Sequence, residues 1–326
     1  MKWITSVHIP ESNHKIGSSD RILSLGSCFS ENMGDRLERL PMSILNQPLG
    51  TLFHPFSIQK IFQEEEIRAE DCYETDGFFV HPDFHSKFTS KSREVLVTQL
   101  KNIQKDTWEF CQEVDWILIT WGTAYQYFDK KLQRPIANCH KQAMQQFEKR
   151  LSTSEELIEE GHNFFRQLKD KYPKAKIILT VSPVRHTKDG LMENSVSKSL
   201  LRVAAAELSH ALSQVHYFPS YELMLDELRD YRFYQADLIH PNELAIEYIW
   251  EKFKATYFAN DLLEIDKAWT NYLLSIHHRV QMEKQAIHNA LLEKIWQEIQ
   301  TKYADLPIHK MGELIKSRIL PNSAKP

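Results

Sequence analysis

Residues 21–34 read RILSLGSCFSENMG and decide the fold of this chain. The apolar run at residues 21–25 predicts a buried strand, and the small residues after it predict a tight turn into an amphipathic helix. Ser27 and Cys28 stand at the start of that helix, where unpaired N–H groups and the positive end of the helix dipole favour a thiolate or an oxyanion. Because open α/β sheets place their chemistry at the carboxyl ends of strands, Cys28 is the first candidate nucleophile. A cysteine after a core strand can also be a small buried apolar residue, so the side chains that accompany it have to distinguish a nucleophile from a structural residue.

The composition bounds the class of protein. Of the 326 residues, 42% are hydrophobic and 26% are charged, as in a globular protein of one large domain or two. A net charge of -4 does not attract polyanions, so we expect no nucleic-acid partner. No window is apolar enough for a signal peptide or a membrane span, so we expect a cytoplasmic protein that does not bind membranes. The four cysteines form no C-x-x-C pair, which indicates reduced thiols rather than disulfides.

Strands and helices alternate along most of the chain. After the first strand, apolar runs predict further strands at residues 42–45, 116–121, 176–181 and 215–218. This alternation predicts a parallel sheet with right-handed crossovers, and hence an α/β fold with a three-layer α/β/α sandwich. Residues 261–318 are helical in pattern and predict no strand. We therefore expect a main domain at residues 1–258 and a C-terminal helical extension at residues 259–326, with helices suited to packing or to homo-oligomerisation.

Three segments between the strands are less regular. A helix is expected from Phe56 to Glu65. Residues 72–89 are rich in aromatic side chains and histidine without helical periodicity, so we interpret them as an irregular insertion. The polar group at residues 138–141 is expected in a loop at the active edge of the sheet, before a helix that continues through Phe147.

A second motif, DLIHPN, occupies residues 237–242. An aspartate three residues before a histidine can fold back so that its carboxylate holds one ring nitrogen, which leaves the other nitrogen free to act as a base. Pro241 suits the first turn of the helix that follows. The pattern is weak alone, but it gains weight near the end of an α/β series that begins with a Gly-Ser-Cys turn. We expect Asp237 and His240 to be catalytic.

These motifs together resemble the GSCFA domain family, which belongs with the SGNH or GDSL-type hydrolases. The resemblance rests on the stretches at residues 25–30, 50–58, 138–141, 182–186 and 237–241, and it spans about residues 1–258. Ser30 stands where the family signature has alanine, a change between small residues. The resemblance implies a flavodoxin-like parallel sheet, as in SGNH hydrolases, and hydrolysis of ester or acyl groups.

The resemblance also assigns roles to individual residues. Cys28 takes the place of the relatives' serine nucleophile, Ser27 is the fallback nucleophile, and Asp237 and His240 match their D-x-x-H pair. Gly50 would serve as the glycine of the oxyanion hole, but the stretch at residues 122–124 lacks the expected asparagine. Loss of one such donor costs about a hundredfold or more in rate. The candidates that would have to replace it are Asn46, Thr123, Asn138 and His140.

The leading hypothesis is an acyl-transfer enzyme that uses neither a cofactor nor a metal. His240, oriented by Asp237, would deprotonate Cys28, whose thiolate would attack the carbonyl of a small-molecule or carbohydrate ester. Arg185, with His186 beside it, would bind an anionic or sugar part of the substrate. Two alternatives stay open: a zinc site and a catalytically inactive hydrolase fold that binds a carbohydrate or a partner. The zinc ligands would come from Cys28, Cys139, His140, His186 and His240.

Overall fold

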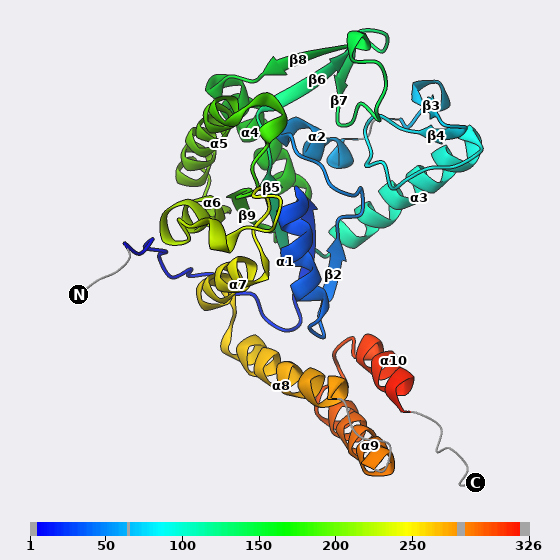
Figure 1. The fold of residues 1–326 in the computed structure, drawn as a ribbon, viewed down its shortest axis with the longest axis vertical. Coiled ribbons are helices and arrows are strands. Elements are labelled where there is room, and N and C mark those ends of the chain that lie inside the picture. The colour runs from blue at the N-terminus through cyan, green and yellow to red at the C-terminus, as the bar shows by residue number, and fades with distance from the viewer. Residues whose placement is uncertain (1–4, 64–65, 279–283, 320–326) are drawn as a thin grey trace.

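The computed structural model describes residues 5–63, 66–278 and 284–319. At its centre lies a five-stranded parallel sheet with the strand order β10-β9-β5-β1-β2 (Figure 1). The strands are β1 (Arg21–Gly26), β2 (Ser43–Asn46), β5 (Trp116–Trp121), β9 (Lys176–Val181) and β10 (Val215–Tyr217). Taken in chain order, these strands are arranged 2-1-3-4-5, which is the flavodoxin-like order. The predicted α/β sandwich is therefore confirmed.

Helices cover both faces of this sheet. One face packs against α3 (Arg93–Cys111), α4 (Ser154–Lys171) and α5 (Leu191–Ala211). The other packs against α1 (Cys28–Glu38) and α7 (Glu243–Tyr257). Successive side chains of a strand point to opposite faces, so Leu23 and Leu25 join the first apolar cluster and Ile22 joins the second. A strand that is buried on both faces explains why the sequence shows a continuous apolar run there.

Gly26 forms the turn from β1 into α1. Its φ is +128°, and a Cβ atom built on it would lie 2.2 Å from the carbonyl oxygen of Thr120 in β5. The next residue, Ser27, donates its backbone N–H to that same oxygen at 3.1 Å. The Ser27 hydroxyl accepts a hydrogen bond from the Phe29 N–H at 3.3 Å, so it caps α1, which begins at Cys28.

Two small antiparallel sheets were not expected from the sequence. Residues 72–89, predicted to be irregular, contain a hairpin of β3 (Tyr73–Thr75) and β4 (Phe78–Val80). The other sheet contains β7 (Arg134–Ile136), β6 (Tyr125–Asp129) and β8 (Phe147–Leu151), in that order.

The prediction of a helix that continues through Phe147 is therefore wrong. Only a short 3-10 turn at Met144–Gln146 precedes β8, which pairs with β6. Burial along the first four residues of β8 alternates with the period of a strand.

The helix expected from Phe56 is shorter than predicted. Helix α2 spans Pro55–Gln59, and a 3-10 turn continues it to Phe62. Gln63 is extended, and the expected end at Glu65 lies outside the described residues. Two shorter elements follow β10, namely α6 (Ser220–Glu222) and a π-helical turn at Leu223–Glu227.

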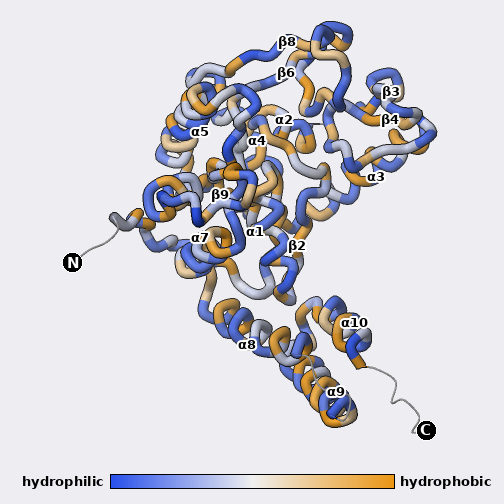
Figure 2. Tube along the Cα trace, in the orientation of Figure 1, coloured by the Kyte–Doolittle hydropathy of each residue, from blue (hydrophilic) through white to orange (hydrophobic). Residues whose placement is uncertain are grey.

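Three helices follow α7. They are α8 (Asn260–His277), α9 (Gln285–Lys302) and α10 (His309–Arg318), and they lie at the opposite end of the molecule from β6 and β8 (Figure 1). Hydrophobic and hydrophilic residues alternate along α8 and α9 in Figure 2, as in amphipathic helices. Buried residues of all three helices, among them Trp269, Ile299 and Ile315, join the apolar cluster that contains α1 and α7. None of the helices within the described ranges is both long enough and apolar enough to span a bilayer.

The substitution Gly26→Ala should destabilise the protein by at least about 3 kcal/mol, because the new methyl group would overlap the Thr120 carbonyl and force β1 away from β5. Urea unfolding followed by circular dichroism measures this. Gly77→Ala is the matched control: Gly77 also has a positive φ, +77°, but its Cβ would meet no atom within 4 Å. That variant should lose only about 1 kcal/mol. Equal losses in the two variants would contradict the role given to the contact with Thr120.

Candidate active site

The ends of β1 and β5 meet at the carboxyl edge of the sheet. The strand order changes direction between these two strands, and ligands of open α/β sheets bind at such a switch point. A loop crosses both strand ends: Leu52 donates its N–H to the Gly26 carbonyl at 2.8 Å, and Gly122 donates its N–H to the Phe53 carbonyl at 2.7 Å. The Gly-Ser-Cys turn is thus tied to the loop after β5.

Cys28 is the half-buried first residue of α1, whereas Ser27 is completely buried and uses its hydroxyl as the helix cap. Burial raises the pKa of the Cys28 thiol, and the positive charge of Lys198 opposes this increase. The side chain is therefore a neutral thiol at neutral pH and needs a base to become a nucleophile. Of the two candidate nucleophiles, only Cys28 has an accessible side chain.

Gln47, the first residue after β2, supports the Gly-Ser-Cys turn. Its side chain is 4% exposed, and its amide donates hydrogen bonds to the carbonyls of Gly26 and Ser27 at 3.3 and 3.2 Å and to the hydroxyl of Ser30. We did not single out this residue from the sequence, because a glutamine before a proline in a loop carries no distinctive signal. Only the fold shows that it fixes the backbone at residues 26–30.

Asp237 and His240 form a hydrogen-bonded pair. The His240 Nδ1 lies 2.6 Å from the Asp237 Oδ2, while the backbone N–H groups of Ile239 and His240 donate to Oδ1 at 2.9 and 3.0 Å. The hydrogen bond from His240, with these backbone bonds, lowers the pKa of Asp237 to about 2. The carboxylate is thus charged at neutral pH and holds one ring nitrogen, as the D-x-x-H spacing predicts. The His240 side chain is 41% exposed.

The loop that carries His240 packs against the segment that follows β9. Arg185 donates its backbone N–H to the Ile239 carbonyl at 3.4 Å and its guanidinium to the Leu238 carbonyl at 3.3 Å. Burial lowers the pKa of His186 to about 3, and the positive charges of Lys198 and His240 are among the further causes. The loop of His240 is thus joined to the segment that carries His186, which follows β9, the strand next to β5.

Two features relate His240 to Cys28. The side chains of Ile239 and Cys28 pack against the same apolar cluster, on the α1 and α7 side of the sheet. Strands β9 and β1 are separated only by β5, which places their ends about 10 Å apart. Within the described residues, however, no hydrogen bond joins His240 to Cys28 or Ser27. The structure brings the two motifs to one edge of the sheet, but within the described residues no hydrogen bond joins their side chains.

Arg185 lines a small cavity beside this loop. Its guanidinium stacks on the rings of Tyr231 and Tyr234, with 5.3 and 4.3 Å to the ring centroids. The cavity has a volume of about 200 Å³ and is also lined by Arg229 and Asp230. Aromatic faces, two guanidinium groups and a carboxylate are groups that bind sugars or anions.

Lys198 is the most unusual residue near the switch point. It lies on α5 with 1% of its surface exposed, and its ammonium donates to the carbonyls of Gly122 and Ser182 at 2.6 and 2.7 Å. Burial lowers its pKa to about 7. We did not single it out from the sequence, although a signal was present: Lys198 precedes Leu201 and Ala205 by three and seven residues, on the face that this helix buries.

The expected oxyanion-hole residues near the edge, Gly50, Asn46 and Thr123, each already have a hydrogen-bond partner. The Gly50 N–H already donates to the Gln47 carbonyl at 2.8 Å, and the Asn46 amide bonds Asp35 at 3.1 Å beside α1. The Thr123 hydroxyl lies next to Gly122, 3.1 Å from the hydroxyl of Ser197.

Asn138 and His140 belong to a different region. The Asn138 side chain accepts the backbone N–H of His140, and the His140 ring bonds the carbonyl of His81 at 2.8 Å. His140 is buried there against the ring of Tyr73. The loop after β7 therefore carries both residues away from the Gly-Ser-Cys turn and toward the β3–β4 hairpin.

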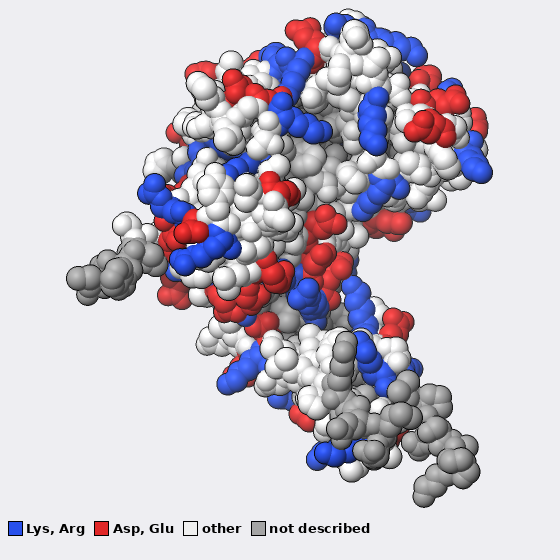
Figure 3. Space-filling model, viewed as in Figure 1, with Lys and Arg blue, Asp and Glu red and all other residues white. Residues whose placement is uncertain are grey.

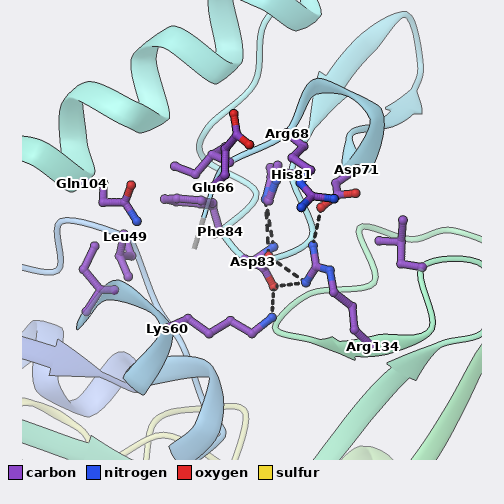
Figure 4. A pocket seen from close by; sticks show the side chains of 13 residues that line it. Leu49, Lys60, Glu66, Arg68, Asp71, His81, Asp83, Phe84, Gln104 and Arg134 are labelled. Atoms are coloured by element: carbon purple, nitrogen blue, oxygen red, sulfur yellow. Dashed lines mark hydrogen bonds and ion pairs between the residues drawn. The ribbon is translucent and has the colours of Figure 1, made fainter. Parts of the chain in front are cut away.

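A cavity of about 410 Å³ occupies this second region (Figure 4). Asp83 binds the ammonium of Lys60 at 2.5 Å and the guanidinium of Arg134 at 2.8 Å, and Arg134 also binds Asp71 at 2.8 Å. Burial alone would raise the pKa of Asp83, but the two cations outweigh it and hold that pKa below its usual value. These charged groups satisfy one another, which is typical of a structural network.

The zinc alternative finds no support in the part of the chain that is described. No three His, Cys, Asp or Glu side chains lie close enough together there to hold a metal ion. Of the proposed ligands, His140 and Cys139 follow β7 and lie near the β3–β4 hairpin, while Cys28, His186 and His240 are at the switch point.

On the face shown in Figure 3, basic and acidic side chains are interspersed rather than gathered into one basic patch.

The substitution Asp83→Asn should destabilise the protein by about 3 kcal/mol, because it leaves the cations of Lys60 and Arg134 without their shared carboxylate. Because the folded state holds the pKa of Asp83 below that of the unfolded chain, the loss should be full near neutral pH. It should shrink as acid protonates the wild-type carboxyl. Thermal unfolding at several pH values measures both effects. Glu66→Gln on the exposed rim of the same cavity is the control and should change stability by less than about 0.5 kcal/mol. A loss for Asp83→Asn that does not vary with pH would contradict the charge argument.

Comparison with protein families places most of the chain in a known family. The family model described as the GSCFA family matches residues 21–253, from the start of β1 into α7. The search of curated proteins found no match.

Proposed function

Because this chain belongs to the GSCFA family, we propose that its carboxyl edge hydrolyses ester or acetyl groups through an acyl-enzyme on Cys28. The hydrogen bond between Asp237 and His240 supports this most directly. A charged carboxylate on Nδ1 fixes the ring tautomer with its proton on Nδ1, which leaves the lone pair of Nε2 available as a base. The exposed ring lies beside the edge at which a substrate would enter.

The reaction begins with proton transfer from the Cys28 thiol to the His240 Nε2 as the sulfur attacks the carbonyl carbon. The carbon–oxygen bond of the ester then breaks, and the imidazolium returns the proton to the departing alcohol oxygen. Water attacks the thioester in the second half, with His240 accepting a proton from the water, and the acid is released with a free thiol. Asp237 stays ionised throughout and stabilises the imidazolium.

The state of Cys28 fits a base-assisted mechanism. Its pKa is raised by burial, so a preformed thiolate is scarce and the proton has to be removed during attack. Closure of the gap between the two side chains has to accompany substrate binding, since catalytic hydrogen bonds often tighten only in the complex. The start of α1 supplies backbone N–H groups toward Cys28, which suits an oxyanion.

We propose an acylated carbohydrate as the substrate. The cavity beside the His240 loop combines the faces of Tyr231 and Tyr234 with the guanidinium groups of Arg185 and Arg229. Such a cavity can hold a sugar ring or an anionic substituent while the acyl group extends toward the switch point.

Cys28→Ala should lower kcat by at least about a thousandfold, and Asp237→Asn by a comparable factor, because each removes a member of a unit that acts together. Hydrolysis of acetylated sugars and of short aryl esters by purified protein is the measurement. Cys139→Ala, which removes the other half-buried thiol, is the control and should leave kcat within about twofold. Ser27→Ala should cost stability through the lost helix cap, about 1 kcal/mol, but should not abolish turnover. Full turnover by Cys28→Ala would eliminate the proposal.

A second candidate is a hydrolase fold that binds an acylated carbohydrate without turning it over. It is favoured by the lack of an asparagine at residues 122–124 and by the lack, within the described residues, of a hydrogen bond between His240 and Cys28. Calorimetric titration with acetylated sugars separates the two functions. Saturable binding with no product from the wild-type protein would favour the second function, and binding followed by product release would eliminate it.

A further inference from the structure

Lys198 carries a buried charge that no carboxylate neutralises within the described residues. Its ammonium is bound by two neutral carbonyl oxygens, those of Gly122 and Ser182. Burying an ammonium costs several kcal/mol, and replacement of buried charges by apolar side chains often leaves stability unchanged or improved. Stability alone therefore does not explain a lysine here, and its surroundings have to be considered.

The position of the ammonium is set by the sheet. Gly122 and Ser182 are the first residues after β5 and β9, so Nζ bridges the carboxyl ends of these two neighbouring strands. The opposite neighbour of β5 is β1, which ends at the turn that carries Cys28. The side chain of Cys28 and the ammonium of Lys198 interact electrostatically, and each changes the proton affinity of the other.

We propose that Lys198 is a positioning residue of the switch-point site, whose buried ammonium supplies the counter-charge for the Cys28 thiolate and for the oxyanion formed from it. This inference rests on the proposed function, because it assumes that negative charge develops at Cys28. No bond to Lys198 forms or breaks. Because Lys198 is buried, its field is weakly screened, and it stabilises the charge that the missing asparagine would otherwise have stabilised.

The two strand ends give this charge a fixed place. A lysine held by two carbonyls does not have to reorganise when the thiol ionises, which is the condition for electrostatic preorganisation. The interaction is also reciprocal: ionisation of Cys28 raises the affinity of Lys198 for its proton by the same free energy by which Lys198 favours the thiolate.

The test follows alkylation of Cys28 by iodoacetamide, quantified by peptide mass spectrometry from about pH 5.5 to pH 9.5. Wild-type protein is compared with Lys198→Gln, which keeps an amide donor for the two carbonyls but removes the charge. Lys188→Gln is the matched control, because it removes a positive charge from the exposed segment just before α5. In the wild-type and Lys198→Gln samples, the thiol of Cys139 reports any general change in folding.

We expect wild-type Cys28 to react at least about tenfold faster than in Lys198→Gln below pH 7, since a nearby opposite charge shifts a pKa by one unit or more. This advantage should fall toward one as the pH rises beyond the pKa of Lys198, about 7, because the amine then loses its charge. Lys188→Gln should follow the wild-type profile at every pH. A ratio of wild-type to Lys198→Gln alkylation rates that equals one at every pH would overturn the inference. So would a rate reduction in Lys198→Gln that has the same size at every pH.

The wild-type profile provides a second measurement that requires no variant at Lys198. Coupling predicts a shoulder just above pH 7 in the plot of alkylation rate against pH. In that range the thiolate–ammonium state and the thiol–amine state bind the same number of protons, so their ratio does not change with pH. A straight rise of one logarithmic unit per pH unit through this range would contradict it.

Alkylation needs no substrate, so the result is independent of hydrolysis: a coupled Cys28 without turnover would defeat the proposed function alone. Turnover that depends on Cys28 without coupling would defeat only the role of Lys198.

Discussion

The close approach of Gly26 to Thr120 is the contact on which the rest of the structure depends. At this point β1 is still paired with β5, yet the chain already has to turn into α1, and only a residue without a side chain fits between the two strands. The positive φ at Gly26 then directs Ser27 onto the cap of α1 and Cys28 onto its first turn. Sheet order, helix direction and the placement of the thiol are thus consequences of one contact.

The groups around the switch point are arranged by depth. Ser27, Gln47 and Lys198 are buried and bind backbone atoms, so they hold the ends of the strands in place. Cys28 is half-buried, and His240 with Asp237 is open to solvent. Burial therefore lowers the proton affinity of the lysine and raises that of the thiol, while the imidazole keeps contact with water and with an entering substrate.

The two polar regions of the molecule obey different electrostatic rules. Around Asp83, cations and carboxylates are paired directly, and their mutual attraction offsets the cost of burial. Near β5 and β9, the partners of the Lys198 ammonium among the described residues are carbonyl dipoles, so its positive field extends to its neighbours. The first arrangement joins the β3–β4 hairpin region to the β6–β8 sheet, and the second is suited to stabilising a negative charge that forms during a reaction.

The sequence by itself determined the parallel sheet, because strands buried on both faces need continuous apolar runs, and the runs at residues 116–121 and 176–181 match β5 and β9 to the residue. It also determined the contact between Asp237 and His240, since three residues of separation suffice to bring the side chains together. Tertiary structure alone decided which distant groups meet. The pairing of β8 with β6 overrode the helix expected there, and the loop after β7 carried Asn138 and His140 to the hairpin. Lys198 met its two carbonyl partners only when α5 packed across the ends of β5 and β9. The partners of a charged residue on a helix depend on what packs against that face, and no local sequence pattern encodes this.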